Sequence, residues 1–269
     1  MSSSSAIRKG EGRFGRTVSG LAIALGCALF LGGFAWGAVE YRPYTVPTNS
    51  MQPTVRPGDR VLAQKVSGSD VRRGDVVVFQ DKLWGDLPEV KRVVGVGGDV
   101  VKCCDTQSRL TVNGTAVDEE GYLEGSGGSD ASAGSDASAG SDASAAPGGS
   151  GLPGVPASVT KFSTTVPRGS LFLLGDNRAV SQDSRIRLTD AQHGAVPVSA
   201  VKGRVDGTVW PLGRVGTLSP TTAFKAVPGG GTSAEGPLRW IVVMVVVGAV
   251  LILGGAAYGP LAGLLRRRR

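Results

Sequence analysis

The amino-acid sequence predicts a mainly β fold, an antiparallel β domain with one transmembrane helix at each end of the chain. Three observations support this fold class. Two long apolar runs without charged residues lie near the two ends, at 18–39 and 240–258. Between them, short runs of β-branched and large apolar residues are separated by turn signals, as is typical of strands. The same middle region has no stretch with a sustained helical period.

The first apolar run is long enough to cross a bilayer. As a helix, its 22 uncharged residues would span roughly 33 Å, and a bilayer core is about 30 Å thick. Basic residues precede the run, so a cleaved secretory signal is the alternative. The run is long for a signal core, however, and Glu40-Tyr41-Arg42 follows it instead of small residues. We therefore expect a cytoplasmic basic N-terminus at 1–17 and a retained transmembrane helix at 18–39.

The second apolar run predicts a transmembrane helix at 238–259, followed by a cytoplasmic basic tail at 260–269. Four consecutive arginines, Arg266–Arg269, follow this run, and four basic residues precede the first one. Basic flanks favour the cytoplasmic side of a membrane. We therefore predict a two-pass protein of the cell membrane, with the lipid bilayer as a partner. Both termini would be cytoplasmic and residues 40–237 would lie on the outer face.

Residues 40–237 are expected to form one extracytoplasmic β domain. Gly-Asp pairs punctuate this region, and Asn113-Gly114 is a turn typical of hairpins. The predicted strands pack one face inward and contain the runs Val61–Ala63, Val76–Phe79, Val93–Val94, Val100–Val101, Leu110–Val112, Leu171–Leu174 and Val205–Trp210.

A biased segment interrupts this domain at residues 125–158. It contains three identical copies of Gly-Ser-Asp-Ala-Ser-Ala. Such a composition offers few apolar side chains to bury, so burial cannot offset the entropy lost on ordering. We predict a disordered insertion on a loop of the β domain.

The formal net charge of +7 at first suggests a nucleic-acid-binding protein. Residues 1–39 carry a net charge of +3 and residues 238–269 carry +5, whereas residues 40–237 carry −1. The positive charge therefore belongs to the membrane flanks. We expect no nucleic acid among the partners.

Histidine and cysteine limit the chemistry that this chain can perform. The single histidine, His193, lies in a polar, turn-like setting and is interpreted as a surface residue. The adjacent Cys103 and Cys104 fit the end of a buried strand, and no C-x-x-C or other metal-ligand spacing occurs. We therefore expect neither a metal nor another cofactor. A hydrolase built from this chain needs a base other than histidine, and lysine is the obvious substitute.

Four sequence boxes indicate which hydrolase this is. In chain order they are Pro47-Thr48-Asn49-Ser50-Met51-Gln52-Pro53-Thr54, Arg73-Gly74-Asp75-Val76-Val77, Lys91-Arg92-Val93-Val94-Gly95-Val96-Gly97-Gly98-Asp99 and Gly175-Asp176-Asn177-Arg178-Ala179-Val180-Ser181-Gln182-Asp183-Ser184-Arg185. This ordered set, behind a membrane anchor, resembles the type I signal peptidases, membrane serine proteases that remove signal peptides. The resemblance implies that secretory preproteins are the substrates and that cleavage follows small residues in an Ala-x-Ala pattern.

The resemblance also implies that Ser50 is the nucleophile and Lys91 the general base. A free lysine has a pKa of about 10.4, so a lysine base must be held in its neutral form. Desolvation favours that form. Aliphatic neighbours at Val90, Val93 and Val94 suit a dry lysine on a strand.

Thr48 resembles a residue whose hydroxyl completes the oxyanion hole together with the amide of Ser50. Hydrogen-bond donors placed where charge develops stabilise the transition state of acyl transfer. Asn49 departs from the glycine that is common before the nucleophile, although asparagine tolerates unusual backbone angles better than most residues.

The last box supplies the supporting residues that the resemblance implies. Ser181 is expected to hydrogen-bond Lys91 and to orient it. Asp183 and Arg185 resemble supporting ion-pair residues, with Arg92 and Asp176 as their expected partners.

Two other functions remain open at this point. A self-cleaving repressor also uses a Ser/Lys pair, but such proteins are soluble and linked to DNA binding. A non-catalytic membrane receptor built on a β domain would be unaffected by Ser50→Ala and Lys91→Ala.

Overall fold

The computed structural model describes residues 7–123 and 160–267. The chain divides into two compact units, one formed by Met1–Arg42 with Glu235–Arg269 and the other by Pro43–Ala234. The predicted insertion at 125–158 lies outside the described residues.

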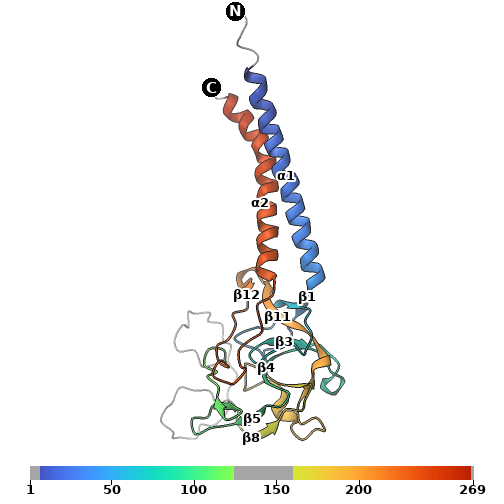
Figure 1. Cartoon of the computed structure of the whole chain (residues 1–269), viewed down its shortest axis with the longest axis vertical. Helices are drawn as coiled ribbons and strands as arrows, with labels where there is room; N and C mark the ends of the chain where they lie inside the picture. Colours follow the sequence, from blue (N-terminus) through green and yellow to red (C-terminus); the bar gives the residue numbers. More distant parts are fainter. Residues whose placement is uncertain (1–6, 124–159, 268–269) are drawn as a thin grey trace, which may run out of the picture. The chain divides into compact units, whose positions relative to one another are not determined.

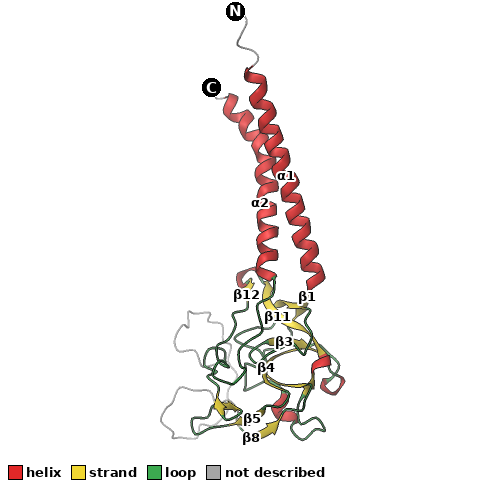
Figure 2. Ribbon diagram, viewed as in Figure 1, coloured by secondary structure: helices red, strands yellow, loops and turns green. Residues whose placement is uncertain are grey.

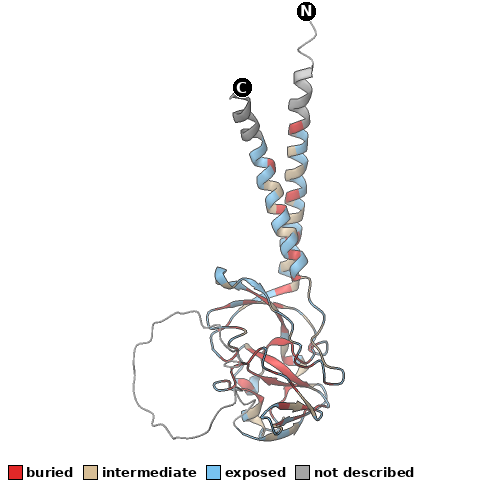
Figure 3. Cartoon of the chain, turned by 90° about the vertical axis from the view of Figure 1, so that its left-hand side faces the viewer, coloured by how far each residue is buried: buried red, intermediate tan, exposed pale blue. Residues whose placement is uncertain are grey.

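The first unit contains two long helices, α1 (Ile7–Glu40) and α2 (Leu238–Arg267), seen in Figures 1 and 2. Thr17–Glu40 and Leu238–Tyr258 are long and apolar enough to cross a membrane. Most of the helix surface that Figure 3 colours is exposed, as suits helices whose apolar side chains face lipid.

Small residues let α1 and α2 pack closely. A Cβ atom on Gly26 would lie 2.8 Å from the carbonyl oxygen of Gly248, and Ser19 Oγ donates to the carbonyl oxygen of Gly255 at 2.6 Å. Glycine and serine at such contacts are typical of membrane helix pairs.

The second unit consists of two β-sheets (Figure 2), and the short connections at 97–99 and 166–169 join them. The larger sheet has the order β1-β2-β11-β3-β4-β9-β10, with β12 paired to β11. Its strands are β1 (Tyr41–Thr45), β2 (Arg60–Gln64), β3 (Val76–Phe79), β4 (Glu89–Val96), β9 (Ser170–Leu174), β10 (Val196–Pro197), β11 (Val201–Trp210) and β12 (Gly216–Thr217). The smaller sheet has the order β7-β6-β5-β8 and contains β5 (Val100–Cys103), β6 (Leu110–Val112), β7 (Thr115–Ala116) and β8 (Phe162–Thr165).

The strand pairs are antiparallel in both sheets, for example β3 with β4 and β5 with β8. Asn113 and Gly114 both have positive φ in the turn between β6 and β7, as a two-residue hairpin turn requires. Short 3₁₀ helices lie in the connections at Lys82–Trp84, Ser184–Arg187, Val198–Ala200 and Leu212–Arg214. Together with α1 and α2, these sheets confirm the predicted fold class.

The expectation that each strand packs only one face inward is wrong for β3 and β4. Val76 and Val78 of β3 belong to one apolar cluster, whereas Val77 and Phe79 belong to another. Both faces of the strand are therefore covered, and all four residues are buried. β4 is likewise buried from Val90 to Gly95, so Lys91 and Arg92 on this strand lie in a dry environment.

Candidate active site

Ser50 lies in a compact turn that two buried side chains anchor. Met51 and Val55 are fully buried in the apolar cluster beside β3 and β4. Within the turn, the amide of Val55 donates to the carbonyl of Met51 at 2.9 Å. The carbonyl of Ser50 also accepts from the amide of Asn177 at 3.1 Å, and only 8% of Ser50 is exposed. The turn therefore holds the hydroxyl of Ser50 at a fixed, nearly dry position.

Lys91 projects from β4 towards this hydroxyl. Its Nζ lies 3.2 Å from Ser50 Oγ, although the two residues are 41 positions apart in sequence. The same Nζ lies 3.0 Å from Glu89 Oε2. Lys91 is 3% exposed, so the amine is almost completely removed from solvent.

Thr48 lies beside the hydroxyl of Ser50. Thr48 Oγ1 is 3.2 Å from Ser50 Oγ, and Thr48 is exposed to solvent.

Arg92 and Asp176 form a buried ion pair on the other side of β4. Arg92 Nε and Nη2 donate to the two carboxylate oxygens of Asp176 at 2.8 and 2.6 Å, and Thr54 Oγ1 donates to the same carboxylate at 2.5 Å. Burial alone would lower the pKa of Arg92, but the charge and hydrogen bonds of Asp176 raise it above its ordinary value. This pair links β4, the Ser50 turn and the 175–187 loop.

The ion pairs differ from those that the sequence analysis expected. Asp183 and Arg185 pair with each other, with 2.8 Å between Arg185 Nε and Asp183 Oδ1. The reason is local, because Asp183 also caps the 3₁₀ turn that Arg185 enters and accepts from its amide. Asp183 Oδ2 further accepts from the amide of Gly175 at 3.0 Å, which closes the loop.

The expected hydrogen bond from Ser181 to Lys91 is absent. Ser181 Oγ is buried and has no hydrogen-bond partner, whereas Lys91 Nζ contacts Glu89 and Ser50. Ser181 nevertheless lies in the site, because a Cβ atom on Gly175 would overlap both Ser181 Oγ and the carbonyl oxygen of Ser50.

A second buried network was not found from the sequence. Arg178 Nη2 and Nη1 donate to the two carboxylate oxygens of Glu119 at 2.5 and 3.1 Å, and the hydroxyl of Tyr122 donates to Glu119 at 2.5 Å. The guanidinium of Arg92 stacks 4.1 Å from the centre of the Tyr122 ring. Burial and the charge of Glu119 raise the pKa of Tyr122 well above its ordinary value. No motif marks Glu119, which stands just before the biased segment.

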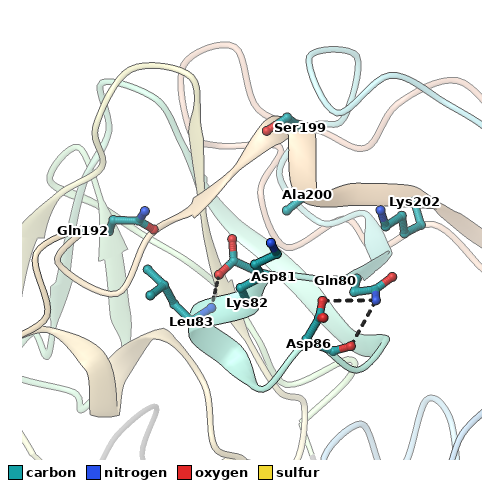
Figure 4. A pocket seen from close by; sticks show the side chains of 9 residues that line it. All are labelled: Gln80, Asp81, Lys82, Leu83, Asp86, Gln192, Ser199, Ala200 and Lys202. Carbon is teal, nitrogen blue, oxygen red and sulfur yellow. Dashed lines mark hydrogen bonds between the residues drawn. The ribbon is translucent and has the colours of Figure 1, made fainter.

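A separate surface pocket contains none of these residues (Figure 4). It is lined by Gln80, Asp81, Lys82, Leu83, Asp86, Gln192, Ser199, Ala200 and Lys202. Some of its polar groups are engaged locally, since Asp81 accepts from the amide of Leu83 and Gln80 donates to Asp86. His193, which the sequence predicts to be a surface residue, is exposed. It directly follows Gln192, one of the residues that line this pocket.

Comparison with known proteins gives a consistent result. Residues 16–210 match the family described as signal peptidase, peptidase S26. The chain is 31% identical over 225 residues to a probable signal peptidase I of Mycobacterium leprae, covering 65% of this chain and 70% of the relative. It is also 31% identical over 183 residues to signal peptidase IB of Staphylococcus aureus, covering 66% of this chain and 83% of the relative.

Among solved structures, a signal peptidase I from Enterococcus faecalis matches with 23% identity and a TM-score of 0.31. That match covers 49% of this chain and 94% of the other. The family match spans the four sequence boxes, the Ser50 turn and β4. The chain therefore belongs to the signal peptidase family, peptidase S26.

Proposed function

We propose that this signal peptidase cleaves secretory preproteins with Ser50 as nucleophile and Lys91 as general base. The observation that carries the proposal is the 3.2 Å separation between Lys91 Nζ and Ser50 Oγ in a nearly dry setting. A serine hydroxyl is a weak nucleophile unless a neighbouring base accepts its proton. Lys91 is the only lysine that the described contacts bring to Ser50.

The reaction follows from this pair. The neutral amine of Lys91 accepts the proton of Ser50 Oγ as that oxygen attacks the carbonyl carbon of the scissile peptide. The resulting ammonium then gives the proton to the leaving amine of the mature protein, and an acyl-enzyme remains. Water attacks this ester with Lys91 again accepting the proton, which releases the signal peptide and restores Ser50.

The hydroxyl of Thr48 and the amide of Ser50 are proposed to stabilise the oxyanion. Preorganised donors of this kind contribute about 3–4 kcal/mol to lowering the barrier in other serine proteases. The remaining supporting residues do not contact the reacting atoms and act by positioning the loop and the turn. Arg92 with Asp176 and Asp183 with Arg185 hold the 175–187 loop against the Ser50 turn, and Ser181 lies in that loop.

The substrate is proposed to bind as an extended strand, with small residues before the cut in an Ala-x-Ala pattern. Extended peptides gain affinity from main-chain hydrogen bonds and specificity from pockets for alternate side chains. Small pockets would select alanine at the two alternate positions.

Purified full-length protein in detergent, incubated with a synthetic preprotein, tests the proposal. We expect Ser50→Ala and Lys91→Ala each to lower kcat/KM by at least roughly a thousandfold. The chain offers a matched control, because Lys102 on β5 lies opposite Ser163 on β8 and both are exposed. Lys102→Ala and Ser163→Ala should retain full activity. Normal turnover by a protein lacking either Ser50 or Lys91 would refute the proposal.

A further inference from the structure

We propose that Glu89 is a positioning residue that holds the amine of Lys91 in the free enzyme and releases it when a substrate binds. The inference rests on the proposed role of Lys91 as general base. Glu89 and Lys91 are separated by one residue on β4, so their side chains leave the strand on the same face. Glu89 Oε2 reaches Lys91 Nζ at 3.0 Å, closer than the 3.2 Å to Ser50 Oγ.

This contact opposes the reaction if it persists. A carboxylate beside an amine favours the ammonium form, and an ammonium cannot accept the proton of Ser50. The catalytic step therefore requires that the carboxylate of Glu89 move away from Nζ.

Glu89 is built to move, whereas the other groups around Nζ are fixed. Its side chain is 29% exposed, against 4% for the side chain of Lys91. Glu89 therefore reaches the amine from the solvent side, the side from which a peptide must approach Ser50. A substrate strand bound in front of Ser50 occupies the space through which the carboxylate reaches Lys91.

A released amine has another hydroxyl available to it. Ser181 Oγ is buried without a hydrogen-bond partner and lies beside the carbonyl of Ser50. An unsatisfied buried hydroxyl is unfavourable, so Ser181 Oγ would gain from a hydrogen bond with an amine freed from Glu89. In the free enzyme, Glu89 therefore holds the Lys91 amine while the hydroxyl of Ser181 has no hydrogen-bond partner.

The other charged groups of the neighbouring elements are already paired. The Ser50 turn presents only the hydroxyls of Thr48, Ser50 and Thr54 to the site, and β3 presents apolar side chains. The charged pairs of β4 and the 175–187 loop are Arg92 with Asp176, Arg178 with Glu119 and Asp183 with Arg185. Within residues 7–123 and 160–267, Glu89 is the carboxylate that an ion pair joins to Lys91.

The pH dependence of cleavage by Glu89→Gln tests the inference in the full-length protein. The acidic limb of kcat/KM reports the free enzyme, and that of kcat reports the enzyme–substrate complex. Glu89→Gln removes the negative charge 3.0 Å from the Lys91 amine, so the acidic limb of kcat/KM should move to lower pH. The limb of kcat should stay in place, because substrate has already displaced Glu89 in wild type. If both limbs move, or if neither does, the inference is wrong.

Two further variants complete the experiment. Asp190→Asn removes a carboxylate from the exposed ion pair with Arg187 and should leave both limbs unchanged. If Glu89→Gln does not fold, Glu89→Thr places a good strand former at the same position. It should likewise shift the acidic limb of kcat/KM and leave that of kcat in place. Lys91→Ala separates the two proposals, because a fully active Lys91→Ala refutes the proposed base, whereas unmoved limbs in Glu89→Gln refute only the role of Glu89.

Discussion

At the scale of single residues, the site depends on one position where no side chain fits. Gly175 begins the 175–187 loop, and a Cβ atom there would overlap both Ser181 Oγ and the carbonyl oxygen of Ser50. The serine side chain can rotate away, but the carbonyl belongs to the backbone that positions the nucleophile. The absence of a side chain at Gly175 is therefore a requirement of the Ser50 turn.

We expect Gly175→Ala to displace Ser50 and to reduce kcat/KM by more than tenfold, with a loss of about 1–3 kcal/mol in stability. Cleavage kinetics and thermal unfolding measure the two effects. Gly213→Ala is the control, since a Cβ atom at Gly213 meets nothing within 4 Å and its φ is not positive. Full activity in Gly175→Ala would mean that the loop and the turn are less tightly packed than described.

Sequence motifs identified two residues that the fold brings together, although their catalytic roles stay a prediction. The Ser50 and Lys91 boxes indicated a pair that the fold brings to 3.2 Å. Glu119 had no such signal, because its partner Arg178 is 59 positions away and only tertiary structure joins them. Glu89 had a signal that was not used, since strand alternation alone places it on the same face as Lys91.

At the scale of elements, the segment 117–123 supports the loop that carries the supporting residues. Glu119 and Tyr122 of this segment contact Arg178, which in turn donates to the carbonyl of Gly175 at 3.0 Å. Burial lowers the pKa of Arg178, but the charges of Glu119 and Tyr122 and the hydrogen bonds to Glu119 together raise it above its ordinary value. The guanidinium therefore stays charged inside the protein and depends on its partner.

Removal of that partner should be costly. Glu119→Ala leaves a buried, unpaired guanidinium, and such changes destabilise proteins by about 3–5 kcal/mol. Denaturant unfolding of the full-length protein measures the loss. Asp70→Ala, at an exposed position on the surface, should change stability by less than about 0.5 kcal/mol. Equal stability of the two variants would contradict the network.

The strand elements show why burial was only partly predictable. Short apolar runs located β3, β9 and β11 correctly, but a run of four apolar residues such as Val76–Phe79 has no period that tells whether one face or both are covered. The answer depends on Met51 and Leu173, which belong to the two clusters that cover β3 and lie far from it in sequence.

At the scale of the whole molecule, charge and hydropathy together determine the expected topology. Both apolar helices have basic flanks at the ends of the chain, and residues 40–237 are almost neutral. We propose that both termini are cytoplasmic and that the β unit lies outside. Every contact of the proposed site comes from within Pro43–Ala234.

Reporter fusions test this topology. A phosphatase that folds only outside the cytoplasm should be inactive when fused after Arg269 and active when fused after Ala234. An active fusion after Arg269 would place the C-terminus outside and contradict the two-pass arrangement. A fluorescent protein that matures only in the cytoplasm should give the opposite pattern.

The pairing of β5 with both β6 and β8 has an evolutionary consequence for the repeated segment. The chain leaves the small sheet after β7 and rejoins it at β8, so its exit and return are fixed by strands and not by the intervening residues. For the disordered segment that the composition predicts, doubling the length costs only about 0.6 kcal/mol in closure entropy. We therefore expect that replication slippage can add or delete copies of Gly-Ser-Asp-Ala-Ser-Ala at little cost in stability.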